Sequence, residues 1–188
     1  MSSYIFDVET DGFLDVVSKV HCIVLKDVDT NTMIHLPVKE AVAKLEKADL
    51  IIGHNIIKYD IPVLQKLYGF DFKNKILDTI VATRLLFPDV KEKDFQRKDF
   101  PRDCIGRHSL KAWGNRIGNY KAQFETDWKT YSPEMLDYCT QDVEVTYNLW
   151  KMIEQKGYSQ QAMDLEHEVS LLIFKQESYG FSFDTDGA

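Results

Sequence analysis

The chain has 188 residues, 44% of them hydrophobic, which is enough for one compact domain with a substantial core. Its formal net charge of −7 argues against broad, non-specific binding to duplex nucleic acid, although metal ions can still neutralise a phosphate locally. The three cysteines are scattered without C-x-x-C spacing, which predicts reduced thiols and excludes a disulfide framework. The sequence shows neither a signal-peptide pattern nor an apolar run of about 18 residues. We therefore expect a soluble, intracellular protein with no membrane partner.

Strands and helices alternate along the first half of the chain. Residues 4–8 form an apolar run that predicts a buried strand, and residues 21–38 predict a hairpin with its turn at "DTNT". Apolar spacing predicts a helix over residues 38–48, and "DLIIGHN" at 49–55 predicts a short strand. A further helix is expected over 60–69, with Asp60 as its N-cap and Gly69 at its end.

The second half is mainly helical. Residues 78–87 predict a helix capped by Asp78, and 88–108 is a polar segment that we expect to be a long loop. Eight Lys and Arg residues against four acids lie between positions 91 and 116, and they favour either a solvated loop or a phosphate-facing patch. Three more helices are expected, over 109–118, 132–157 and 159–180. The order of elements predicts one mixed α/β domain.

Two carboxylates follow the first predicted strand. Asp7 and Glu9 are two residues apart, so on a strand they point to the same face. Two such charges repel each other unless a cation lies between them. On its own, an Asp-x-Glu pair is more often the solvated end of a strand.

Two further acidic positions occur at suitable places. Asp60 lies at a strand-to-helix junction, where ligands of α/β folds bind, although an N-cap role alone would explain it. Tyr138 and Asp142 are four residues apart and share one face of the longest predicted helix. Four carboxylates beside a tyrosine form an all-oxygen site that suits hard cations such as Mg²⁺ or Mn²⁺. A pair of such ions can hold a phosphodiester, activate water and stabilise the leaving oxygen. His54 and His108 lack metal-ligand spacing and are expected to be structural or to face the substrate.

The motifs "DVETDGF", "GHNIIKYD" and "YCTQD" resemble, in order and spacing, the three motifs of the DEDD exonuclease superfamily. The tyrosine four residues before the last aspartate is similar to the Tyr subtype, whereas the His subtype has its histidine where this chain has Asp137. "GHNIIKYDIPVL", "SLKAWGNRIG" and "KQESYGFSFDT" resemble the 3′→5′ proofreading domain of family A, polymerase I-like DNA polymerases, in the versions of short-tailed bacteriophages. The resemblance covers essentially the whole chain.

The resemblance implies roles for the five motif residues. Asp7 would bridge two divalent cations, Mg²⁺ or Mn²⁺. Glu9 and Asp142 would complete the first metal site, and Asp60 would hold the second. Tyr138 would orient the attacking water together with Glu9, because its ordinary pKa near 10 makes it a poor general base at neutral pH.

The resemblance also implies substrate contacts. Around the last nucleotides of the strand it places Thr10, Gly12, Phe13, Asn55 and Tyr59. Phe13 could stack on a terminal base, although an aromatic residue after a strand is more often part of the core. Asn55 could donate to a phosphate or sugar.

The implied fold is α/β, a ribonuclease H-like mixed sheet of five strands flanked by helices, with room for the fifth strand near "KIL". Residues 1–188 would form the exonuclease domain. Residues 158–188 would supply a C-terminal helix leading toward a polymerase domain that this sequence lacks. The expected partner is the frayed 3′ end of a DNA primer, bound by a monomer in the cytoplasm of an infected bacterial host. Two alternatives remain open: an exoribonuclease of the same superfamily, and a catalytically silent domain that binds DNA or braces a polymerase.

Overall fold

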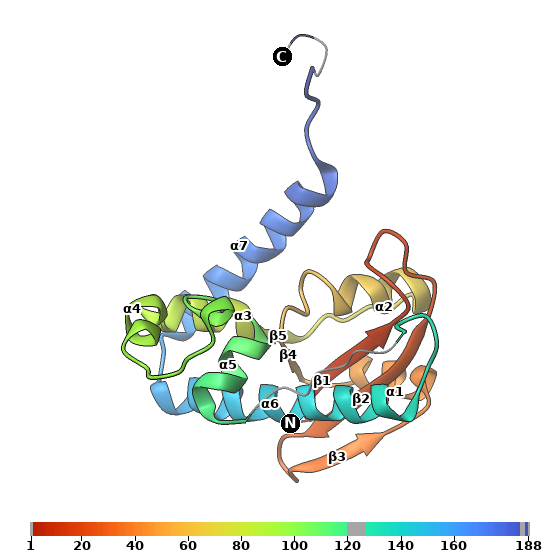
Figure 1. Ribbon diagram of the computed structural model, residues 1–188. Helices are drawn as coiled ribbons and strands as arrows, with labels where there is room; N and C mark the ends of the chain where they lie inside the picture. Colours follow the sequence, from red (N-terminus) through yellow and green to blue (C-terminus); the bar gives the residue numbers. More distant parts are fainter. Residues whose placement is uncertain (1, 120–126, 185–186, 188) are drawn as a thin grey trace.

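A mixed five-stranded sheet organises the molecule. The computed structural model describes residues 2–119, 127–184 and 187, and its strands lie in the order β3-β2-β1-β4-β5. The strands are β1 Ser3–Thr10, β2 Val20–Asp27, β3 Thr32–His35, β4 Leu50–Gly53 and β5 Lys75–Asp78. β1 pairs antiparallel with β2 and parallel with β4 (Figure 1). The predicted mixed sheet is confirmed, and β5 is the fifth strand expected near "KIL".

Helices cover both faces of the sheet. They are α1 Val38–Glu46, α2 Asp60–Tyr68, α3 Thr79–Leu86, α4 Val90–Phe95, α5 Leu110–Ile117, α6 Pro133–Lys156 and α7 Gln160–Tyr179. Apolar side chains of α1 and α2 form one core with the sheet, and those of α3, α5 and α6 form the other. α7 packs against the body near its start and then projects from it (Figure 1). The part of the chain that the structure describes contains no helix both long and apolar enough to cross a membrane.

The alternation of side chains along β1 decides where its acids point. Phe6 and Val8 pack into the core under α1 and α2, whereas Ile5 packs into the core under α6. Because successive strand residues face opposite sides, Asp7 and Glu9 share the face of Ile5 and lie toward α6. β1 therefore carries both acids to the α6 side of the sheet.

Most predicted helix ends agree with the structure. The Ser132 hydroxyl accepts a hydrogen bond from the Met135 amide at 3.3 Å, and Gly69 ends α2 with a left-handed backbone (φ 68°). The prediction that Asp60 caps α2 is wrong, because Tyr59 occupies the cap position. Asp60 is the first residue of the helix, and its carboxylate accepts instead from the amide of Val8 in β1, at 3.2 Å.

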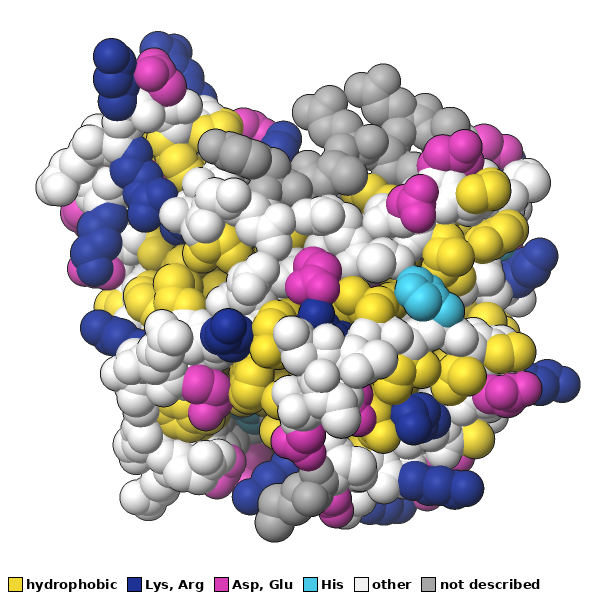
Figure 2. All heavy atoms as spheres, turned by 90° about the horizontal axis from the view of Figure 1, so that it is seen from below, with side chains coloured by type: hydrophobic (Ala, Val, Ile, Leu, Met, Phe, Trp, Pro, Cys, Tyr) yellow, Lys and Arg dark blue, Asp and Glu magenta, His cyan; other side chains and the backbone are white. Residues whose placement is uncertain are grey.

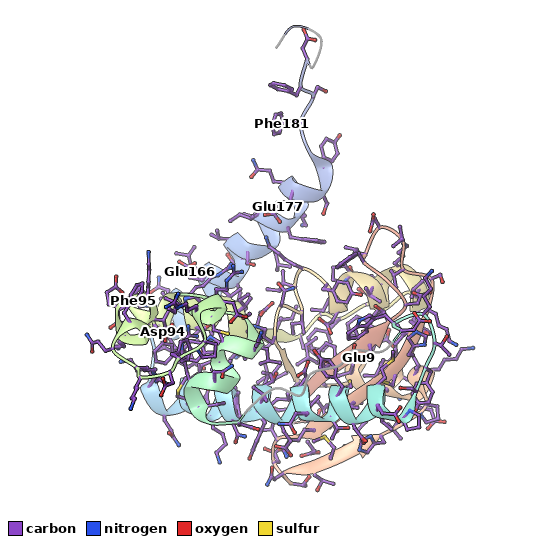
Figure 3. All side chains as sticks on the ribbon, viewed as in Figure 1. Glu9, Asp94, Phe95, Glu166, Glu177 and Phe181 are labelled. Atoms are coloured by element: carbon purple, nitrogen blue, oxygen red, sulfur yellow. The ribbon has the colours of Figure 1, made fainter. Side chains whose placement is uncertain are left out.

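The prediction of a long loop over residues 88–108 is also wrong. The segment forms α4 and a 3₁₀ helix at Arg102–Cys104, and it folds around a buried ion pair between Asp94 and Arg116. The Asp94 carboxylate accepts from Arg116 Nε at 3.0 Å, from Nη2 at 2.7 Å and from the Gly106 amide at 3.0 Å. Figure 3 shows Asp94 among the side chains around α4 and α5. The prediction failed because this order comes from one long-range pair rather than from apolar periodicity.

Part of the local positive charge is neutralised within this segment. Lys93 pairs with Asp89 and Lys111 with Asp103, both at the surface. In Figure 2, Lys and Arg side chains lie along the left edge, the side on which α4 lies in Figure 1, and others lie along the right and lower right edges. Asp103 is already among the four acids counted between positions 91 and 116, so only Asp89 reduces the excess of positive charge.

Arg116→Ala should destabilise the fold strongly. The Asp94 and Arg116 side chains are only 1% and 4% exposed, so removal of the guanidinium leaves a carboxylate buried without its counter-ion. Loss of one partner of a buried pair costs about 3–5 kcal/mol, which thermal unfolding would register as a large drop in Tm. Lys93→Ala, which breaks an exposed pair, is the control and should barely change Tm. An equally small effect of both changes would contradict a structural role for the buried pair.

Candidate active site

The five motif residues line one cavity. It measures about 180 Å³, and its described lining comprises Asp7, Val8, Glu9, His54, Asn55, Tyr59, Asp60, Trp128, Tyr138 and Asp142. β1 contributes its end, where Figure 3 shows Glu9; α2 contributes its first residue; α6 contributes a tyrosine and an aspartate four residues apart. Residues 135 positions apart in the sequence thus meet at one place.

Asp7 and Glu9 line this cavity and lie close to Cys139 of α6. Ligand atoms of Asp7, Glu9 and Cys139 lie within 4.8 Å of one another. The Cys139 thiol donates to the Asp7 backbone oxygen at 3.4 Å and to its carboxylate Oδ2 at 3.6 Å. Glu9 is only 7% exposed. Asp7 is half-buried. Two carboxylates this close repel each other, and a cation between them would offset the repulsion.

Asp60 and Asp142 are buried more deeply, with exposures of 4% and 3%. The pKa of Asp60 is raised from 3.8 to about 7, mainly by burial and in smaller part by the negative charges of Asp78 and Asp142. A divalent cation would offset this penalty. The oxygen-rich donor set therefore fits Mg²⁺ or Mn²⁺, with Cys139 as a neighbouring thiol.

A larger cavity of about 650 Å³ adjoins the first. Its described lining comprises Val8, Glu9, Thr10, Gly12, Phe13, Asn55, Tyr59 and Trp128, and so includes all five residues predicted to contact substrate. The Tyr59 hydroxyl donates to the Gly12 carbonyl at 2.6 Å and is hydrogen-bonded to the Thr10 hydroxyl, which ties the two motifs together. Phe13 is 82% exposed and is not a core residue.

The Asp78 carboxylate holds the turn after β4, in addition to its predicted role as the N-cap of α3. Asn55 has a left-handed backbone (φ 67°), and its backbone N–H donates to the Asp78 carboxylate at 2.8 Å. The Ile57 amide donates to the same carboxylate at 3.0 Å, so Asp78 both caps α3 and fixes this turn. Gly53 leaves no room for a side chain, since a Cβ there would lie 2.2 Å from Ile56 Cγ2.

The two histidines occupy different surroundings. His54 lines the smaller cavity, and its Nδ1 lies 2.8 Å from the Thr79 hydroxyl. His108 lies outside both cavities and packs beside Trp113, with a ring separation of 5.9 Å. Burial, followed by the charge of Arg116, lowers the pKa of His108 to about 4, so its ring is neutral at physiological pH. His108 is thus structural, whereas His54 faces the site.

Trp128 is the site residue that sequence reasoning missed. It lines both cavities, and its ring meets that of Tyr138 edge to face, with centroids 5.8 Å apart and planes at 82°. Trp128 lies five residues before the start of α6 at Pro133, and no motif in the sequence includes it.

The model of a 3′-5′ exonuclease family matches residues 6–157, which contain all three acidic motifs. The chain belongs to this 3′-5′ exonuclease family. It is accordingly an exonuclease-type hydrolase domain, with its carboxylates at the cavity described above.

Two DNA-directed DNA polymerases are relatives of this exonuclease domain. Those of Escherichia phage T7 and Enterobacteria phage T3 are each 30% identical to it over 95% of the chain. The chain spans 33% of the length of each polymerase. The predicted kinship with phage polymerase I-like exonuclease domains is thereby confirmed.

Several solved structures share the fold. They include Brucella melitensis NrnC with bound Mg²⁺ (TM-score 0.57, 20% identity, 92% of this chain and 80% of that one) and Escherichia coli RNase D, an exoribonuclease (TM-score 0.59, 13% identity, 93% and 45%). The catalytic core of RRP6 from Trypanosoma brucei matches with a TM-score of 0.62 at 16% identity, over 93% of this chain and 46% of that one. At such low identity these structures support the ribonuclease H-like fold alone.

Proposed function

We propose that this exonuclease domain removes nucleotides from the 3′ end of DNA by metal-dependent hydrolysis, releasing 5′-mononucleotides, and that it serves as the proofreading part of a phage DNA polymerase. The observation that carries the proposal is the meeting of four carboxylates and a tyrosine at one cavity beside a larger, aromatic-lined one. The relatives in phages T7 and T3 support DNA as the substrate, because both are DNA polymerases.

The carboxylates would hold two divalent cations. All four line the same cavity. Asp7 would be the ligand shared by both cations, Glu9 and Asp142 would complete the first site, and Asp60 would hold the second. When bound, such cations bind the phosphate, activate water and stabilise the leaving oxygen. The protein's own task is to hold four oxygen ligands rigidly, and the hydrogen bond from the Val8 amide to Asp60 serves this task.

Tyr138 would orient the attacking water. It stands on the same helical face as Asp142, one turn earlier, and lines the same cavity as Glu9. The Tyr138 hydroxyl would act by hydrogen bonding to this water. The strand end would lie in the larger cavity, between Phe13 and the hydroxyl-bearing pair Thr10 and Tyr59.

The two adjoining cavities suit the unpaired 3′ end of a DNA strand. A mismatched end costs less to unpair than a matched one, which supplies part of the selectivity of proofreading. A few unpaired nucleotides need a stacking surface and metals more than a broad basic face, in keeping with the net charge of −7.

The domain context forms part of the proposal. The family match ends at residue 157, which supports residues 158–188 as a segment leading toward a polymerase domain. Residues 185, 186 and 188 of that segment lie outside the described part of the chain. The phage relatives support action inside an infected bacterial cell, and we propose that the domain acts as a monomer.

A labelled-strand assay tests the substrate and the direction. With Mg²⁺, a 5′-labelled single-stranded DNA should give a ladder that shortens from the 3′ end, and a blocked 3′ terminus should prevent it. The RNA twin of the same sequence should be cut more slowly. Equal or faster action on RNA would favour an exoribonuclease, which the shared fold with RNase D makes the alternative. Binding without cleavage would indicate a silent, bracing domain.

Tyr138→Phe should lower kcat by about 10- to 100-fold, because the water loses a hydrogen-bonding partner while all four carboxylates remain. Single-turnover kinetics on the labelled DNA would measure the effect. Asp137→Ala removes an exposed acid from the preceding position of α6 and serves as the control, with no expected change. A loss for Tyr138→Phe as large as that of a carboxylate variant would show that its role is more than orientation.

A further inference from the structure

Trp128 occupies the boundary between the two cavities of the site. It lines the 180 Å³ cavity that holds the carboxylates and the 650 Å³ cavity that holds Phe13. The residue is 40% exposed, so part of the indole faces open space. Trp128 thus reaches both the reacting end of the site and the space proposed for the strand.

The backbone of Trp128 is held by the sheet. Its carbonyl oxygen lies 2.9 Å from His21 Nε2, and since a carbonyl only accepts, this ring nitrogen donates. His21 belongs to β2, which pairs with β1 alongside the catalytic acids. This hydrogen bond restrains the backbone position from which the Trp128 side chain extends.

The indole also restrains the catalytic tyrosine. The rings of Trp128 and Tyr138 pack edge to face at 82°, with centroids 5.8 Å apart. This is one of the two favoured arrangements of an aromatic pair, so it selects one orientation of the Tyr138 ring. Trp128 therefore packs against the ring that carries the Tyr138 hydroxyl.

We propose that Trp128 is a further substrate-binding and positioning residue: its indole stacks on the base at the 3′ end of the strand and holds Tyr138 in its working orientation. This inference rests on the proposed exonuclease function. Every base offers a π-face, so stacking binds any terminal nucleotide without regard to sequence. Phe13 borders only the larger cavity, and it is therefore suited to a base farther from the reacting phosphate.

Intrinsic fluorescence tests the stacking role. The chain has three tryptophans, and Trp113 is buried at 3% exposure. In EDTA, addition of a short single-stranded DNA should quench the wild-type emission and should leave Trp128→Phe largely unquenched. Trp150 lies on α6 outside both cavities, so Trp150→Phe is the matched control. Its emission should still be quenched by the DNA. Full quenching in Trp128→Phe would overturn the stacking role, and this variant remains informative even if Trp128→Ala does not fold.

Kinetics test the positioning role. Trp128→Ala should raise KM about tenfold through lost stacking and lower kcat about tenfold through misorientation of Tyr138. Trp128→Phe should recover most of kcat. In a Tyr138→Phe background, Trp128→Ala should change kcat less than threefold, because the group that it positions is already gone. Fully additive effects on kcat would overturn the positioning role.

The failure of this inference differs from the failure of the proposed function. If the wild-type protein does not shorten DNA from its 3′ end, the proposed function is wrong and this inference falls with it. If the wild type does so and Trp128→Ala has unchanged KM and kcat, only the role of Trp128 is wrong.

Discussion

Asp7→Ala should lower the rate of 3′-end removal by about 1000-fold. A ligand atom of Asp7 lies within 4.8 Å of those of Glu9 and Cys139 at the candidate metal cluster, and we propose Asp7 as the ligand that two cations share. Loss of a shared ligand removes about 4 kcal/mol or more of transition-state stabilisation. Single-turnover cleavage of a labelled single-stranded DNA measures this ratio.

The control for this change is Asp137→Ala, since Asp137 is an exposed acid one residue from Tyr138. It should cleave within about twofold of the wild type, because surface substitutions away from a site have small effects. Near-normal activity of Asp7→Ala would contradict a two-metal site centred on this residue.

Asp60→Asn should have opposite effects on activity and stability. The substitution removes a proposed metal ligand, so cleavage should fall by about 100-fold or more. It also removes a buried charge, while the side-chain oxygen can still accept from the Val8 amide as Asp60 does at 3.2 Å. The metal-free variant should therefore have a higher Tm than the metal-free wild type at neutral pH and above.

The pH dependence follows from the raised pKa of Asp60. Burial is the main cause of a pKa of about 7 in the folded protein, against 3.8 in the unfolded chain. Between these values the folded state binds more protons than the unfolded state, so the free energy of unfolding falls as pH rises from about 4 to about 7. The loss amounts to at most about 4 kcal/mol.

Thermal unfolding in EDTA across this pH range tests the prediction. The wild type should lose stability with rising pH, whereas the profile of Asp60→Asn should be flatter. Added Mg²⁺ should stabilise the wild type more above pH 7 than at pH 5, because the cation competes with the proton. Parallel profiles for both proteins would show that Asp60 is not the titrating group.

Local patterns in the sequence were enough to predict most of the fold. Ser132, Asp78 and Gly69 mark helix ends through short-range hydrogen bonds or backbone geometry, so their effects are visible in neighbouring residues. The order of strands and helices then favours a mixed sheet, and the structure has one.

Long-range partners account for what the sequence could not predict. Asp94 orders the segment after α3 through Arg116, 22 residues away, and neither residue lies in an apolar pattern. Asp60 was expected to cap its own helix and instead binds the Val8 amide, 52 residues away. A helix-capping rule considers only the neighbouring backbone. Here the carboxylate binds a backbone amide that is distant in the sequence and close in the fold.

The candidate site also contains residues that motifs predict and residues that only the structure identifies. The acids were predicted because three motifs with fixed spacing describe one chemistry, and the structure places them at one cavity. Trp128 belongs to no motif, and its relevance comes from its place in the lining of both cavities and from its contact with the Tyr138 ring. The second role of Asp78, as the group that fixes the Asn55 turn, likewise needs coordinates to be seen.

The most direct test of the central claim is a metal add-back experiment on a 5′-labelled single-stranded DNA. The wild type and Asp7→Ala would be compared side by side in EDTA and then after addition of Mg²⁺ or Mn²⁺. We expect no cleavage in EDTA and, after addition of either cation, shortening from the 3′ end by the wild type alone. Undiminished cleavage in EDTA, or equal cleavage by Asp7→Ala, would contradict a metal-dependent exonuclease built on these four carboxylates.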